Sequence, residues 1–241
     1  MAIAREAAQP QGGEGAARAR ADRIYFGAMA LICGVAILGG FTPSFFLRST
    51  LMAGAFPLRP TVITHGALFT VWVALFLTQT ALISARRRDW HRRLGLLGLA
   101  VVPAMAAVGT LLIAGFERSH GVEPALTFAV HVLGNGGPLS LFVAFAAAGL
   151  WWRREPAVHK RLMLFATLAL EPAGFARLIA YFGFGQSPNV PCFGVLCLSC
   201  VVYDLCVDRR VRPVTLVGVL LLFGQVYVTD LLFAYIESAP A

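Results

Sequence analysis

Four histidines are the residues of this chain whose types and spacing suit a chemical role. His91 and His159 lie in two similar basic segments, RRRDWHRRLG and RREPAVHKRL, each followed by a long apolar run. His65 and His131 precede them by 26 and 28 residues. Imidazole is well suited to axial ligation of haem iron. Because the chain has no C-x-x-C-H motif for covalent attachment, the pattern favours a b-type haem.

The elements that must position these histidines are long apolar segments. The chain is 58% apolar and only 13% charged. A helix needs about 20 residues to cross the hydrocarbon core of a bilayer, and each segment is that long or nearly so. We therefore predict an all-α integral membrane bundle in the lipid bilayer, with a disordered tail over 1–22 and one transmembrane domain over 23–241. The predicted spans are 24–46, 61–84, 94–116, 126–152, 162–184, 191–207 and 214–236.

The net charge of +8 is explained by membrane orientation. Most of the 20 Lys and Arg residues fall in the amino-terminal tail and in alternate linkers, and the other linkers hold only Arg48, Arg59 and Arg118. Basic linkers face the cytoplasm. We expect a multi-pass protein of the plasma (inner) membrane, with its amino end cytoplasmic and its carboxyl end outside. The same reasoning excludes a nucleic-acid role.

The repeated basic segments predict a duplicated hairpin. The hairpins at 61–116 and 126–184 would form a four-helix core, and cofactor sites in such bundles are built from facing helices. His65 and His131 would then share a depth near the outer side, and His91 and His159 would face each other at the inner side.

Several other residues in the spans predict polar features. His65, Trp72 and Gln79 recur at intervals of seven, which places them on one helix face that we expect to look into the bundle. The GNGGP run at 134–138 predicts a break in the fourth span, since such a run is costly in a membrane unless it lines a cavity. Glu171 and Asp204 are further charged residues within the spans, where charges are expensive.

Arg177 has two expected roles. It shares a predicted depth with Asp230, so an ion pair between them would join the fifth and seventh spans. Alternatively, Arg177 would reach the propionates of a haem held by His65 and His131.

The histidine layout resembles that of the diheme b-type transmembrane cytochromes, which pass electrons from a reductant such as ascorbate to an acceptor across the membrane. The resemblance implies one haem between His65 and His131 and a second between His91 and His159. The chain departs from that pattern because His91 and His159 stand at the membrane edge among arginines. The segments WHRRLG and VHKRLM also resemble the H-R-x-x-G and H-R-x-x-M motifs of an uncharacterised bacterial family of multi-pass membrane proteins. This second resemblance implies no function, because none is established for that family.

Three hypotheses follow. The first is a transmembrane electron carrier with one or two b haems, partnered by a quinone or small redox molecule. The second is a proton or small-solute transporter using the broken fourth span with Glu171, Arg177 and Asp230. The third is a cofactor-free structural protein. A further alternative for the inner histidines is that they bind a lipid headgroup or quinone head together with their basic neighbours Arg92, Arg93, Lys160 and Arg161.

Overall fold

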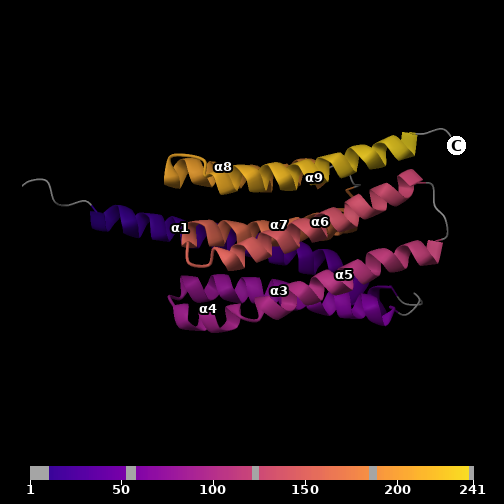
Figure 1. Ribbon diagram of the computed structural model, residues 1–241, viewed down its shortest axis with the longest axis horizontal. Helices are drawn as coiled ribbons and strands as arrows, with labels where there is room; N and C mark the ends of the chain where they lie inside the picture. Colours follow the sequence, from indigo (N-terminus) through magenta and orange to yellow (C-terminus); the bar gives the residue numbers. More distant parts are fainter. Residues whose placement is uncertain (1–10, 53–57, 121–124, 185–188, 239–241) are drawn as a thin grey trace, which may run out of the picture.

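Seven long helices lie side by side in the computed structural model of the chain (Figure 1). The structure describes residues 11–52, 58–120, 125–184 and 189–238, without the side chains of 11, 12, 14, 116–120, 125–131 and 236–238. Each of the seven is long and apolar enough to cross a membrane, which confirms the predicted helical membrane bundle. They are α1 (Gln11–Phe41), α3 (Pro60–Ser84), α5 (Gly98–His120), α6 (Ala125–Trp151), α7 (Pro156–Tyr181), α8 (Asn189–Asp208) and α9 (Pro213–Ser238).

Three short helices connect the long ones. A π-helix, η1 (Thr42–Phe46), and α2 (Arg48–Leu51) follow α1, and α4 (Arg88–Gly95) lies between α3 and α5. The histidine expected at the start of the third span, His91, therefore lies on the separate helix α4. The tail expected to be disordered over 1–22 is helical from Gln11 onward, and residues 1–10 lie outside the described part.

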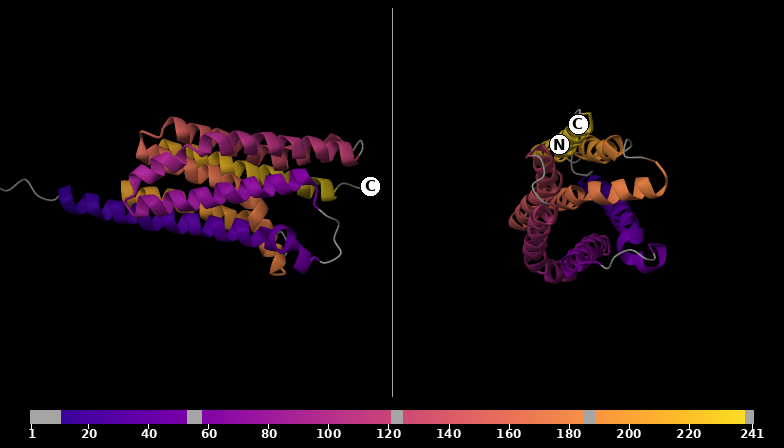
Figure 2. Two further views of the ribbon diagram at one scale, coloured as in Figure 1. Left: turned by 90° about the horizontal axis from the view of Figure 1, so that it is seen from below. Right: turned by 90° about the vertical axis from the view of Figure 1, so that its right-hand side faces the viewer.

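Five helices form a ring in which α3 packs on α5, α5 on α6 and α6 on α7 (Figure 2). Helix α1 closes the ring by packing against both α7 and α3, and α8 and α9 pack outside α7. Helix α7 is the central element, since every residue of it from Arg161 to Glu171 except Met163 is buried. The two hairpins, α3–α5 and α6–α7, thus contribute four of the five helices that surround the core.

The predicted polar face of α3 does point into the bundle. Trp72 is buried and donates its indole N–H to Thr167 Oγ1 on α7 at 3.3 Å, while Phe142 of α6 meets its ring edge-to-face. The side-chain amide atoms of Gln79 and Nδ1 of His65 are buried as well. A seven-residue spacing was therefore a reliable sign of an inward face.

Helices α1 and α7 cross in direct backbone contact. A Cβ added to Gly40 would lie only 2.0 Å from the carbonyl oxygen of Gly174, and one added to Gly174 would lie 2.7 Å from Cα of Ile37. Without side chains at the crossing, the helix axes come closer than bulky residues allow, which is a common way for membrane helices to associate.

The predicted break in the fourth span is wrong, because α6 is helical throughout 125–151 with Pro138 inside it. Pro138 removes one backbone donor, and the neighbouring glycines leave room for α9. A Cβ at Gly137 would lie 3.0 Å from Nε2 of Gln225, and that amide donates to the carbonyl oxygen of Leu133 at 3.2 Å. The GNGGP run thus allows α6 and α9 to pack closely, and it does not interrupt the helix.

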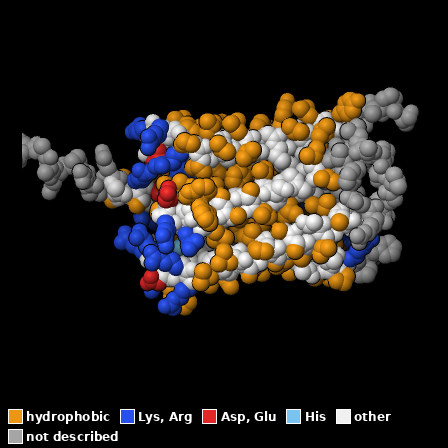
Figure 3. All heavy atoms as spheres, viewed as in Figure 1, with side chains coloured by type: hydrophobic (Ala, Val, Ile, Leu, Met, Phe, Trp, Pro, Cys, Tyr) orange, Lys and Arg blue, Asp and Glu red, His pale blue; other side chains and the backbone are white. Residues whose placement is uncertain are grey.

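Basic side chains gather at one end of the bundle (Figure 3). We call this the basic end. It contains α4, the turn between α6 and α7, and the turn between α8 and α9. The long helices between the two ends carry exposed leucine, valine and phenylalanine side chains that suit contact with lipid.

Candidate functional site

The structure brings His91 and His159 together at the basic end. Their ring centroids are 6.1 Å apart and the ring planes are nearly perpendicular, at 87°. His91 comes from α4 and His159 from the first turns of α7, so residues of both repeated basic segments meet. This pairing of the inner histidines is the contact expected from the two hairpins.

The ring of His159 is held in place by α6. Its Nδ1 lies 2.7 Å from the carbonyl oxygen of Gly149, in the last turn of that helix, where carbonyls lack partners within the helix. A histidine that binds a metal through Nε2 commonly donates its Nδ1–H to a backbone carbonyl in this way. The contact therefore assigns the proton to Nδ1 and leaves Nε2 as the basic nitrogen.

Three buried polar atoms beside the pair have no hydrogen-bond partner among the described residues. They are Nδ1 of His91 and both side-chain amide atoms of Gln79. Gln79 reaches this region from α3, because its Nε2 lies 3.5 Å from the Cβ position of Gly95, one turn after His91 on α4. Buried polar groups in proteins are usually paired, so such a cluster indicates a place for a ligand, ion or water.

The other predicted pair remains a prediction. His65 is half-buried on α3 and its ring lies 4.5 Å, centroid to centroid, from that of Phe69. His131 belongs to α6, but its side chain lies outside the described part of the chain. The structure thus places His65 on the inward face of α3, where it is half-buried. Its pairing with His131 stays untested.

The predicted ion pair between Arg177 and Asp230 is wrong. Arg177 donates to the carbonyl oxygen of Ala173 at 2.7 Å, and its guanidinium lies 4.5 Å from the ring centroid of Phe41. Asp230 is exposed on α9, and no ion pair joins it to Arg177 in the described structure. Equal depth along two helices did not bring the two side chains to the same side.

A buried ionic network lies at the basic end and was missed by sequence reasoning. Arg161 of α7 forms an ion pair with Asp204 of α8, to which its Nε donates at 3.0 Å, and a second with Asp208 at 3.1 Å. Asp208 also binds Arg18 and Arg212. The signal that could have found it is the four-residue spacing of Asp204 and Asp208, which places both on one face of α8.

The same network ties α1 and α9 to α7. Lys160 donates to Asp22 of α1 at 2.6 Å, and the Tyr203 hydroxyl of α8 also donates to Asp22. The hydrogen bond to Asp208 raises the pKa of Arg212, in the turn before α9. Lys160 and Arg161, which were expected to bind lipid headgroups or a quinone, are instead occupied by carboxylates within the chain.

Glu171 is a second buried polar group. It is fully buried on α7 near the crossing with α1, and neither carboxyl oxygen meets a hydrogen-bond donor at normal geometry among the described residues. Its polar neighbour is the thiol of Cys33 on α1, which is a weak hydrogen-bond donor. A charged carboxylate buried in this way is costly unless it is paired.

No family model, curated protein or solved structure matches the chain. Within the residues that the structure describes, no three His, Cys, Asp or Glu side chains converge on a common point.

Proposed function

We propose that the chain is a membrane electron carrier that holds a b-type haem between His91 and His159. The observation that carries this proposal is the meeting of these two rings, 68 residues apart in the sequence, with centroids 6.1 Å apart. Sequence reasoning favoured the outer pair, whose second member, His131, has its side chain outside the described part of the chain.

The separation of the two rings fits a single metal between them. Metal–imidazole bonds are about 2 Å long and a ring centroid lies about 1 Å behind its nitrogen, so two rings on one metal have centroids roughly 6 Å apart. The glycines near the pair, Gly95 and Gly149, are approached by Nε2 of Gln79 and by Sδ of Met163. Both are ends of flexible side chains.

When bound, a haem supplies reversible one-electron chemistry, whose potential depends on its axial ligands and burial. The residues of the chain would hold and orient the haem. The Gly149 carbonyl fixes the tautomer and orientation of His159.

The test is a reduced-minus-oxidised absorption spectrum of protein purified from haem-sufficient cells. We expect a Soret band and a sharp α band, both lost in His91→Ala and in His159→Ala. His65→Ala is the matched control and should retain the bands of the inner site. Bands that persist unchanged in both inner variants would show that these residues are not the ligands.

A proton transporter is the second candidate function, and Glu171 favours it. A buried carboxyl group in the membrane is suited to accept and release a proton. The broken helix and the Arg177–Asp230 pair that also motivated this hypothesis are not found. In proteoliposomes with an internal pH dye, Glu171→Gln should abolish a proton flux that the wild type supports. A wild-type flux equal to that of empty liposomes would end this candidate.

We further propose that the basic end faces the cytoplasm of the cell's inner membrane, with the carboxyl terminus outside. The accumulation of Lys and Arg at one end supports this orientation. A reporter active only in the cytoplasm should be active when inserted in the turn at 152–155 and inactive at the carboxyl terminus. The reverse pattern would refute the orientation.

A further inference from the structure

The turn between α3 and α4 carries positive charge that the described acidic residues leave unpaired. The five arginines of this turn and of helix α4 make no ion pair in the described structure, and Asp89 is the acidic residue that lies among them. At the same end, Lys160, Arg161 and Arg212 are all paired with aspartates. The basic side chains of α7 are therefore matched by aspartates, whereas the cluster at α4 has no ion pair in the described structure. That cluster is formed by Arg86, Arg87, Arg88, Arg92 and Arg93.

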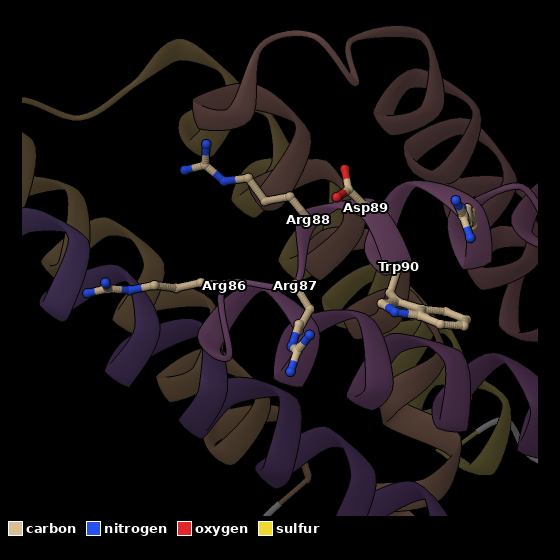
Figure 4. A pocket seen from close by; sticks show the side chains of 6 residues that line it. Arg86, Arg87, Arg88, Asp89 and Trp90 are labelled. Carbon is tan, nitrogen blue, oxygen red and sulfur yellow. The ribbon is translucent and has the colours of Figure 1, made fainter.

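Four of these arginines, all except Arg92, line an open depression of about 370 Å³, which we call the arginine pocket. Figure 4 shows that Arg86 and Arg88 extend in the same direction from the turn. The pocket also lies at the start of α4, whose amino end has no side-chain cap among the described residues. Free N–H groups and guanidinium groups together favour a phosphate-bearing ligand. The lining residues are Arg86, Arg87, Arg88, Asp89, Trp90 and Arg93.

Apolar side chains border the pocket on the side of the bundle. Trp90 is 55% exposed, with the Arg93 guanidinium 5.8 Å from its ring centroid, and tryptophan is typical of the membrane interface. Leu96 and Leu97, in the turn after α4, are 65% and 50% exposed. A ligand in the pocket would contact the arginine side chains. The exposed leucines, less than two helical turns further along the chain, offer a surface suited to acyl chains.

From these observations we propose that the arginine pocket binds the headgroup of an anionic phospholipid. The phosphate would contact the arginines and the start of α4, and the acyl chains would lie along Leu96 and Leu97. A free phosphate would use the cationic groups but not the adjoining leucines. The proposal is independent of haem binding, because the pocket residues do not include the paired histidines.

The experiment is native mass spectrometry of the full chain in nonionic detergent, titrated with dioctanoyl phosphatidylglycerol or dioctanoyl phosphatidylcholine. We expect the wild type to bind the anionic lipid in preference to the zwitterionic one. Each arginine near an anionic surface contributes roughly fivefold in affinity, so Arg87→Gln/Arg88→Gln should weaken binding about 30-fold. The single variant Arg88→Gln should weaken it about fivefold.

The matched control is Arg153→Gln/Arg154→Gln, in the turn between α6 and α7, where two exposed arginines also lie beside exposed tryptophans. This variant should change the affinity less than threefold. Equal loss in both double variants, or unchanged affinity in both pocket variants, would refute the site. Equal binding of the zwitterionic lipid would also refute it, as would displacement of the anionic lipid by an equimolar amount of inorganic phosphate.

Discussion

Replacing the buried Asp204 with Ala should cost more stability than replacing an aspartate at an exposed site. Asp204 is fully buried, accepts from Arg161 Nε at 3.0 Å and also accepts the backbone N–H of Arg212 at 2.9 Å. Removing one partner of a buried ion pair typically costs 3 to 5 kcal/mol, because the other charge stays buried. Asp208 lies 3.1 Å from Arg161 and offers partial compensation. We therefore expect a loss of about 3 kcal/mol, at the lower end of that range.

The assay is unfolding in mixed detergent micelles, followed by far-ultraviolet circular dichroism as the fraction of denaturing detergent rises. Asp230→Ala, at an exposed position on α9, is the control and should change the free energy of unfolding by less than about 0.5 kcal/mol. The double variant Arg161→Met/Asp204→Leu should recover much of the loss, since no buried charge is left unpaired by it. A loss below about 1 kcal/mol in Asp204→Ala, or strict additivity in the double variant, would refute this reasoning.

Three further stability predictions use the same unfolding measurement. Gly174→Ala should destabilise the protein by about 1 to 3 kcal/mol, because its Cβ would overlap Cα of Ile37 at 2.7 Å, and a change under 0.5 kcal/mol would contradict the close crossing. Thr167→Val should cost about 1 to 3 kcal/mol by leaving the buried indole N–H of Trp72 unpaired, and a neutral effect would show that this hydrogen bond contributes nothing. Glu171→Leu should stabilise the protein by about 1 kcal/mol or more because it replaces a buried carboxyl group, whose polar neighbour is only the Cys33 thiol, by an apolar side chain, whereas destabilisation would show that the contact with Cys33 outweighs the cost of burial.

The positions of the spans could be predicted from the sequence because they depend on local properties. A run of apolar residues long enough for the bilayer is visible residue by residue, and the polar linkers bound each run. The inward face of α3 was equally readable, since His65, Trp72 and Gln79 recur at a helical period.

Features that depend on distant residues could not be predicted in this way. The GNGGP run of α6 stays helical because α9, about 90 residues later, brings the Gln225 amide to the Leu133 carbonyl. Likewise, depth along two helices predicted that Arg177 would meet Asp230, but depth says nothing about rotation around each helix axis. The actual partners of the buried charges, Arg161 with Asp204, face each other across α7 and α8.

The candidate site was predictable in part. The repeat of the basic segments predicted that His91 and His159 would face each other, and their rings do meet. The sequence did not indicate that Gly149 would accept from His159 or that Gln79 would lie unpaired nearby, because both contacts depend on the packing of α6 and α3 against the pair.

The haem content of the purified wild-type chain is the measurement that tests the central claim most directly. A pyridine haemochrome assay on protein from haem-sufficient cells should give at least one b-type haem per chain, and His159→Ala should contain one fewer. A wild-type protein that is folded and helical but contains no haem would contradict the proposal that His91 and His159 are axial ligands.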